Sequence, residues 1–206
     1  MTTSATTRTA LLGFAALALA ACAKKENNAA DTTAASSTMT ADTSGMAAGA
    51  ASSTSPSGNW SDPNIVAMLD EANAADSSAG AVAATKGTAA AVRDFARRMM
   101  RDHHQLRAQG AALAKKLNVT PSAPSDDPVP GMAQSETNTL NTTAKGKDFD
   151  KAYIDAEVDA HKKVLDLATK AAAQTQNAEL KNLIQKAAPV IQSHLDKAES
   201  IQKTLK

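Results

Sequence analysis

The chain has 206 residues, a formal net charge of +1 and an aromatic content of 2%. Without a basic excess or aromatic side chains to stack on bases, nucleic acid is disfavoured as a partner. The single cysteine excludes a disulfide within the chain, so a folded domain must be stabilised by its core alone.

The N-terminal residues have the pattern of a bacterial lipoprotein signal peptide. A leader with one positive charge, Arg8, precedes an apolar run at residues 10–22, which is too short for a permanent membrane span of about 20 residues. The run ends in Leu19-Ala20-Ala21-Cys22, which resembles a lipobox. We therefore expect residues 1–21 to be a signal peptide and Cys22 to be lipidated. The alternative is an ordinary secretory signal with a coincidental cysteine.

Lipidation of Cys22 implies a periplasmic protein anchored to a membrane, and Ala23 at the next position favours the outer membrane. Residues 22–60 are rich in Ala, Ser and Thr and contain few large apolar side chains. Such a segment cannot bury enough apolar surface to offset the entropy of ordering it. We expect a disordered tether with a reach of about 30 Å.

Four helices are expected in the folded part, residues 61–206. Asp62 followed by Pro63 is typical of a helix start, Gly87 indicates a stop, and Asn177 is a favourable N-cap. Prolines clustered between residues 118 and 146 indicate a long connection. No segment alternates like a strand, so the predicted fold class is all-α. The expected helices span residues 63–86, 88–117, 147–173 and 178–204.

Residues spaced by three and four define one apolar stripe on each expected helix. In the second helix the stripe includes Met99, His103 and Leu106, whereas His104 lies about 100° away and faces outward. Every stripe contains one inward polar side chain, and these four are Asp76, His103, His161 and His194.

The four inward polar residues should meet in one layer. Each lies within about four residues of its helix midpoint, or about 6 Å along the axis. Helices of similar length packed side by side align near their midpoints. The short links after the first and third helices, with the long connection between the second and third, predict a four-helix ferritin-like bundle with one long crossover.

The motifs resemble those of the DUF4142 family, a bacterial family of ferritin-like helical bundles. The resemblance rests on FARRMMRDHHQL, KGKDFDKAYIDAEVDAHKK and AAPVIQSHLDKA. In this chain the family pattern falls on Asp76, on residues 99–103, on residues 146–153 with His161, and on Pro189 with His194. It covers about residues 62–200. Asp76 stands where the family commonly has Glu, and the crossover is unusually rich in Pro, Ser and Thr.

Three imidazoles and one carboxylate are a sufficient ligand set for a single transition metal ion, with zinc, iron and copper as candidates. The di-iron carboxylate motif is absent, because Met100, Val158 and Ile191 stand three residues before the histidines. Glu157, one turn before His161, is an accessory candidate. Two alternatives need no metal: Asp76 pairs with the histidines in a polar layer that fixes helix register, or the four groups are out of register with one another or face solvent.

Three functions remain open from the sequence. The first is a non-enzymatic envelope lipoprotein, a binding or stress-related module that holds a partner, a metal or a small ligand. The second is a redox or hydrolytic metalloenzyme using the central layer. The third is a structural or interaction module with a metal-free polar core. No nucleophile–base triad or phosphate-binding glycine loop is recognisable, so the sequence favours the first. It specifies no protein partner and no oligomeric state.

Overall fold

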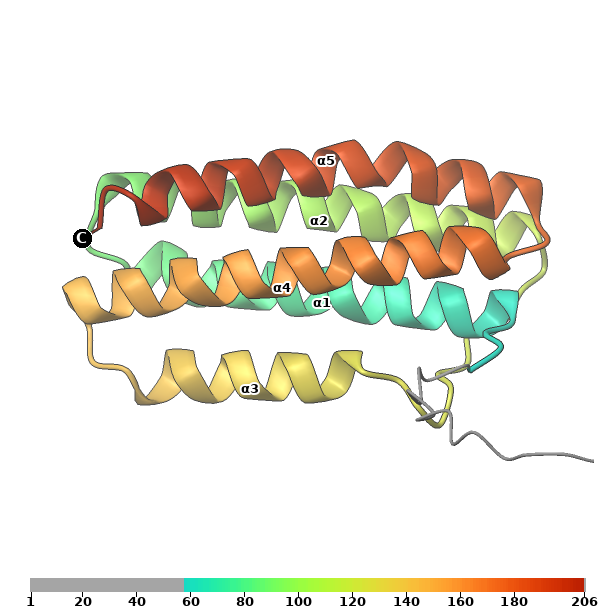
Figure 1. The fold of residues 1–206 in the computed structure, drawn as a ribbon, viewed down its shortest axis with the longest axis horizontal. Coiled ribbons are helices and arrows are strands. Elements are labelled where there is room, and N and C mark those ends of the chain that lie inside the picture. Colours follow the sequence, from blue (N-terminus) through green and yellow to red (C-terminus); the bar gives the residue numbers. More distant parts are fainter. Residues whose placement is uncertain (1–57, 206) are drawn as a thin grey trace, which may run out of the picture. The chain divides into compact units, whose positions relative to one another are not determined.

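The computed structural model describes residues 58–205, which form five α-helices and no strand (Figure 1). The all-α prediction is confirmed, and the four expected helices begin and end within two residues of their predicted ranges. The predicted signal peptide, Cys22 and nearly all of the tether lie outside the described residues. The helices are α1 (Asp62–Lys86), α2 (Ala90–Lys116), α3 (Val129–Thr142), α4 (Lys147–Gln174) and α5 (Ala178–Gln202).

Helix α3 is a fifth helix beyond the four that the sequence predicts, and it lies within the long connection between α2 and α4. Pro130 lies in its first turn, where the missing N–H costs nothing, and the Asp127 carboxylate accepts a hydrogen bond from the Val129 N–H at 2.8 Å. Val129, Glu136 and Leu140 are its buried residues, and their spacing is helical. The many prolines, serines and threonines concealed this short amphipathic pattern in the sequence.

The two helix pairs joined by short links form the most extensive contacts, α1 with α2 and α4 with α5. Helix α3 lies along α1 and α4 (Figure 1). Within residues 58–205, none of the helices has both the length and the apolar character that crossing a bilayer requires.

The core consists of two apolar clusters, one on each side of a polar layer. One cluster includes Phe95, Phe149 and Ile154, and the other includes Ile65 and Leu180. In each of the four long helices, the inward polar residue lies in sequence between residues of the two clusters. The predicted central layer therefore exists. Along the chain, α1 and α5 pass from the cluster of Ile65 to the cluster of Phe95, whereas α2 and α4 pass the opposite way. Helices α1 and α5 therefore run in one direction and α2 and α4 in the other.

Two features fix the helices relative to one another. Asp150, a buried residue of α4, accepts hydrogen bonds from the backbone N–H groups of Thr88 and Ala89 at 2.7 Å and so caps the start of α2. Gly80 of α1 lies so close to α2 that an added Cβ would stand 2.8 Å from the Ala96 carbonyl oxygen. Both contacts hold α2, and with it His103, in place.

The end of the predicted tether is held against the domain. The backbone N–H of Trp60 donates to the side-chain oxygen of Gln174 at 2.8 Å, and the Gln174 amide donates to the Gly58 carbonyl at 3.1 Å. Trp60 also packs against the apolar cluster that contains Ile65. Gly58 and Trp60, which belong to the predicted tether, are thus tied to the helical domain.

Candidate metal centre

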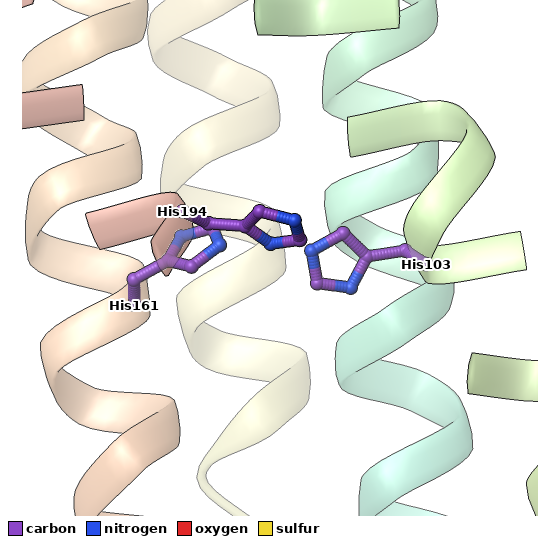
Figure 2. A group of neighbouring side chains, drawn as sticks. All are labelled: His103, His161 and His194. Carbon is purple, nitrogen blue, oxygen red and sulfur yellow. The ribbon is translucent and has the colours of Figure 1, made fainter. Parts of the chain in front are cut away.

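Three histidines from three different helices meet in the polar layer. His103 comes from α2, His161 from α4 and His194 from α5, and Figure 2 shows their rings directed toward one another. The ring centroids are 5.1 to 5.6 Å apart, and one nitrogen of each ring lies within 4.8 Å of those of the other two. All three side chains are buried, with at most 1% exposed. The outward position predicted for His104 is confirmed, since that residue is exposed.

One nitrogen of His103 and of His161 is held by a neutral acceptor. His103 Nδ1 lies 2.8 Å from the side-chain oxygen of Asn73, whose amide nitrogen donates in turn to the Leu69 carbonyl. His161 Nδ1 lies 2.9 Å from the backbone carbonyl of Glu157. Because both acceptors lack a proton to give, each Nδ1 must carry the hydrogen, and each Nε2 carries the lone pair.

His194 is oriented by an acid instead. Its Nε2 lies 3.0 Å from a carboxylate oxygen of Asp102, which also accepts a hydrogen bond from Arg98 at 3.2 Å. Burial alone would raise the pKa of Asp102, but these hydrogen bonds outweigh it and lower that pKa below its ordinary value. Asp102 is therefore ionised, His194 Nε2 donates to it, and Nδ1 carries the lone pair.

The three remaining nitrogens have no partner among the described residues. They are His103 Nε2, His161 Nε2 and His194 Nδ1, and all three are buried. Each buried polar atom without a partner destabilises the folded state by about 1–3 kcal/mol, so three of them in one layer are unusual for a purely structural core. A metal-binding histidine typically has this arrangement, with one nitrogen free and the other N–H held by an oxygen.

Protons compete weakly for two of these imidazoles. Burial, assisted by the neighbouring histidines, lowers the pKa of His103 to about 3. Burial also lowers the pKa of His194 to about 4, although the hydrogen bond to Asp102 opposes the shift. Both rings are therefore neutral at physiological pH, which is the state that a metal ion requires.

A group of buried carboxyls adjoins the histidines on the side of α1 and α3. Asp76, Glu157 and His161 offer ligand atoms within 4.8 Å of one another, and Asp76 lies 3.5 Å from His103 Nδ1. Glu157 is 0% exposed, and both of its carboxyl oxygens lack a hydrogen-bond partner among the described residues. Glu136 of α3 is buried as well and has one unpartnered oxygen.

Burial shifts these three carboxyls toward the protonated form. It raises the pKa of Asp76 well above its ordinary value, with the charges of Glu157 and Glu136 adding to the effect. Burial raises the pKa of Glu157 to about 8, and burial together with the Glu157 charge raises that of Glu136 to about 8. A bound cation would reverse these shifts, because it favours the ionised carboxylates.

The structure brings together all four residues that periodicity selected, Asp76, His103, His161 and His194, and it adds Glu157 as a full member of the layer. The stripe analysis did not select Asp102, which precedes His103 in α2. The structure instead places it against His194, in addition to its pairs with Arg98 and Arg101. Asn73 and Glu136 were missed. Asn73 stands three residues before Asp76 on one helix face, which was a usable signal, whereas Glu136 lies in the helix that was not expected.

The fold and the site together define an all-helical protein with a buried layer of histidines and carboxylates. The chain belongs to the DUF4142 family, described only as a domain of unknown function, whose model matches residues 45–201. Among solved structures, that of CopM in its Cu(II)-bound form is similar, with a TM-score of 0.57 and 14% sequence identity. The match covers 71% of this chain and 99% of that one. No curated protein matches the chain in sequence.

Proposed function

We propose that this protein is a lipid-anchored periplasmic module that binds one transition metal ion in the layer formed by His103, His161 and His194. The observation that carries the proposal is the set of three buried, unpartnered ring nitrogens, each with its lone pair fixed by the acceptor on the opposite side of the ring. Asp76 and Glu157 form a second group with His161 beside these rings, 3.5 Å from His103 Nδ1 and 3.3 Å from His161 Nδ1, respectively.

The residues fit such an ion. Ring nitrogens bind transition metals at about 2.0–2.1 Å, and donor atoms within 4.8 Å of one another reach that geometry through small side-chain rotations. The neighbouring carboxylates would supply negative charge to balance the cation, and the metal would satisfy atoms that otherwise lack partners. Imidazole suits zinc, copper and iron alike. The similar fold of a protein solved with Cu(II) bound makes copper the first ion to test.

The proposal is tested by titrating the purified, metal-stripped protein with Cu(II), Zn(II) and Fe(II), using calorimetry and elemental analysis after desalting. We expect one ion per chain for at least one metal, and at least a hundredfold weaker binding in His161→Ala. His104→Ala is the matched control, because it removes an exposed imidazole one position from His103, and it should bind like the wild type.

Two results would contradict the metal site. A wild-type protein that retains none of the three metals would leave the layer as a structural polar network. Equal loss of binding in His104→Ala and His161→Ala would place the metal on the surface rather than in the core.

The anchoring part of the proposal rests on residues 19–22, which resemble a lipobox. Replacing Cys22 with Ser should move the protein from the membrane fraction to the soluble periplasmic fraction and abolish labelling by a radioactive fatty acid. Membrane association that persists without labelling would mean that the anchor is not a lipid on Cys22. The metal titration is unaffected by either result.

The four long helices and their single crossover are consistent with a ferritin-like bundle in which α3 occupies the crossover. A metalloenzyme is the second candidate, and one observation favours it: a cavity of about 340 Å³ includes Asp76 in its lining and offers a route to the layer. Turnover of a redox or ester substrate that requires the bound metal, and is lost in His161→Ala, would favour this alternative.

A further inference from the structure

An apolar cavity lies beside the polar layer and reaches the surface next to the exposed Arg107 and Ala111. It has a volume of about 340 Å³, and its walls come from α1, α2, α4 and α5. It adjoins the apolar cluster that contains Ile65, and members of that cluster such as Val164 and Ile184 form part of its wall. Small-molecule sites typically have volumes of about 300–1,000 Å³, so this cavity is large enough for a small ligand.

The cavity exists because small residues face it where larger side chains would fill the space. Gly110 and Ala111 of α2 and Ala187 of α5 are part of its lining. A Cβ added to Gly110 would meet no atom within 4 Å. Leu106, which the apolar stripe of α2 places in the core, is only half-buried because it borders this space.

The lining contains four polar residues, Asp70, Asn73, Asp76 and Arg107, and its other residues are apolar or glycine. Arg107 is exposed and forms two hydrogen bonds with Asp70, at 2.9 and 3.0 Å, so the two charges satisfy each other. Asn73 is engaged through its oxygen by His103 and through its nitrogen by Leu69. Asp76, buried at 4% exposure, is the remaining polar group at the inner part. The lining thus offers no free cation to an anionic ligand.

We propose that this cavity binds an uncharged, predominantly apolar small molecule, whose one polar group is directed toward Asp76 and whose apolar body lies along α1, α2 and α5. Apolar cavities take up apolar guests, because water gains few hydrogen bonds from their walls. The inference goes beyond metal binding and stands whether or not the histidine layer holds an ion.

The test uses N-phenyl-1-naphthylamine, a neutral apolar fluorophore, titrated into the purified, metal-free chain in detergent-free buffer. We expect saturable binding of one probe per chain. Gly110→Phe should weaken it at least tenfold by filling the cavity. Gly131→Phe is the matched control: an added Cβ there also meets no atom within 4 Å, but Gly131 lies in α3 and outside the cavity, so binding should change less than twofold.

The charge of the ligand is tested by competition. We expect 1-decanol to displace the probe and decanoate, its anionic counterpart, to displace it at least tenfold less well. Circular dichroism and thermal unfolding would show that Gly110→Phe is folded, and Gly110→Leu provides a second, smaller filling variant. Probe binding that is absent in the wild type, or equal in wild type and both filled variants, would overturn the proposal. Equal displacement of the probe by decanoate and 1-decanol would overturn the proposal that the ligand is uncharged.

Discussion

The metal-free protein is expected to be most stable at mildly acidic pH, about pH 5, and to lose several kcal/mol of unfolding free energy by pH 9. The reason is that the polar layer contains two kinds of group whose pKa values move in opposite directions on folding. The histidines favour folding at higher pH, and the buried carboxyls favour it at lower pH.

On the acid side the histidines dominate. The pKa of His103 falls from 6.5 to about 3 and that of His194 from 6.5 to about 4 on burial. Between these pKa values the unfolded chain binds protons that the folded chain does not. The contribution of the two histidines to stability is therefore complete above pH 6.5 and is lost as the pH falls toward 3. Each group contributes at most about 1.4 kcal/mol per pH unit.

On the alkaline side the carboxyls dominate. The pKa of Glu157 and of Glu136 rises from 4.5 to about 8, and that of Asp76 also rises. The two glutamates keep their protons in the folded state, so their contribution to stability is complete below pH 4.5 and is lost as the pH rises through 8, and Asp76 acts in the same direction. Three carboxyls outweigh two histidines between pH 5 and 6.5, which places the maximum near the acid end of that interval.

Urea unfolding of the metal-free protein at half-unit intervals from pH 4 to pH 9 measures this profile. Glu157→Gln should lose clearly less stability than the wild type between pH 5 and pH 9, because it removes one of the buried acids without changing the shape of the side chain. Asp166→Asn, an exposed position on the same helix, should follow the wild-type curve. A wild-type profile that rises from pH 5 to pH 9 would show that the carboxyls are solvated or already paired.

Replacing Asp102 with Asn should weaken metal binding about 10- to 100-fold while leaving the metal-free fold intact. The carboxylate fixes the hydrogen on His194 Nε2 and so leaves the lone pair of Nδ1 directed into the layer. An amide can present its own N–H group to Nε2, which would transfer the ring hydrogen to Nδ1 and block that ligand. Asp102 is therefore a positioning residue for the metal.

Calorimetric titration of Asp102→Asn with the metal that the wild type retains tests this role. The control is Asp94→Asn, which removes an exposed carboxylate of α2 paired with Arg97. Nitrogen NMR of the histidine rings should show the hydrogen of His194 on Nε2 in the wild type and on Nδ1 in the Asp102 variant. Unchanged affinity together with an unchanged ring tautomer would show that Asp102 does not orient the ligand.

The sequence by itself determined the helical class, the bounds of four helices and the inward direction of His103, His161 and His194. These features follow from local geometry: a period of 3.6 residues separates His103 from His104 by about 100°, whatever the rest of the chain does. The central layer was also predictable, since each polar residue lies near the middle of a helix and short links align the helices.

Only the tertiary structure decided what surrounds those rings. Which ring nitrogen of His103 and His194 carries the lone pair depends on Asn73 and Asp102, which contact these rings from other helices. Glu136 lies in α3, whose Thr- and Asn-rich sequence favours a helix only weakly, so packing of its apolar face on α1 and α4 stabilises it. The cavity beside Gly110 likewise depends on how far apart the helices settle. Helix rotation and spacing arise from contacts between segments distant in sequence, and no local pattern records them.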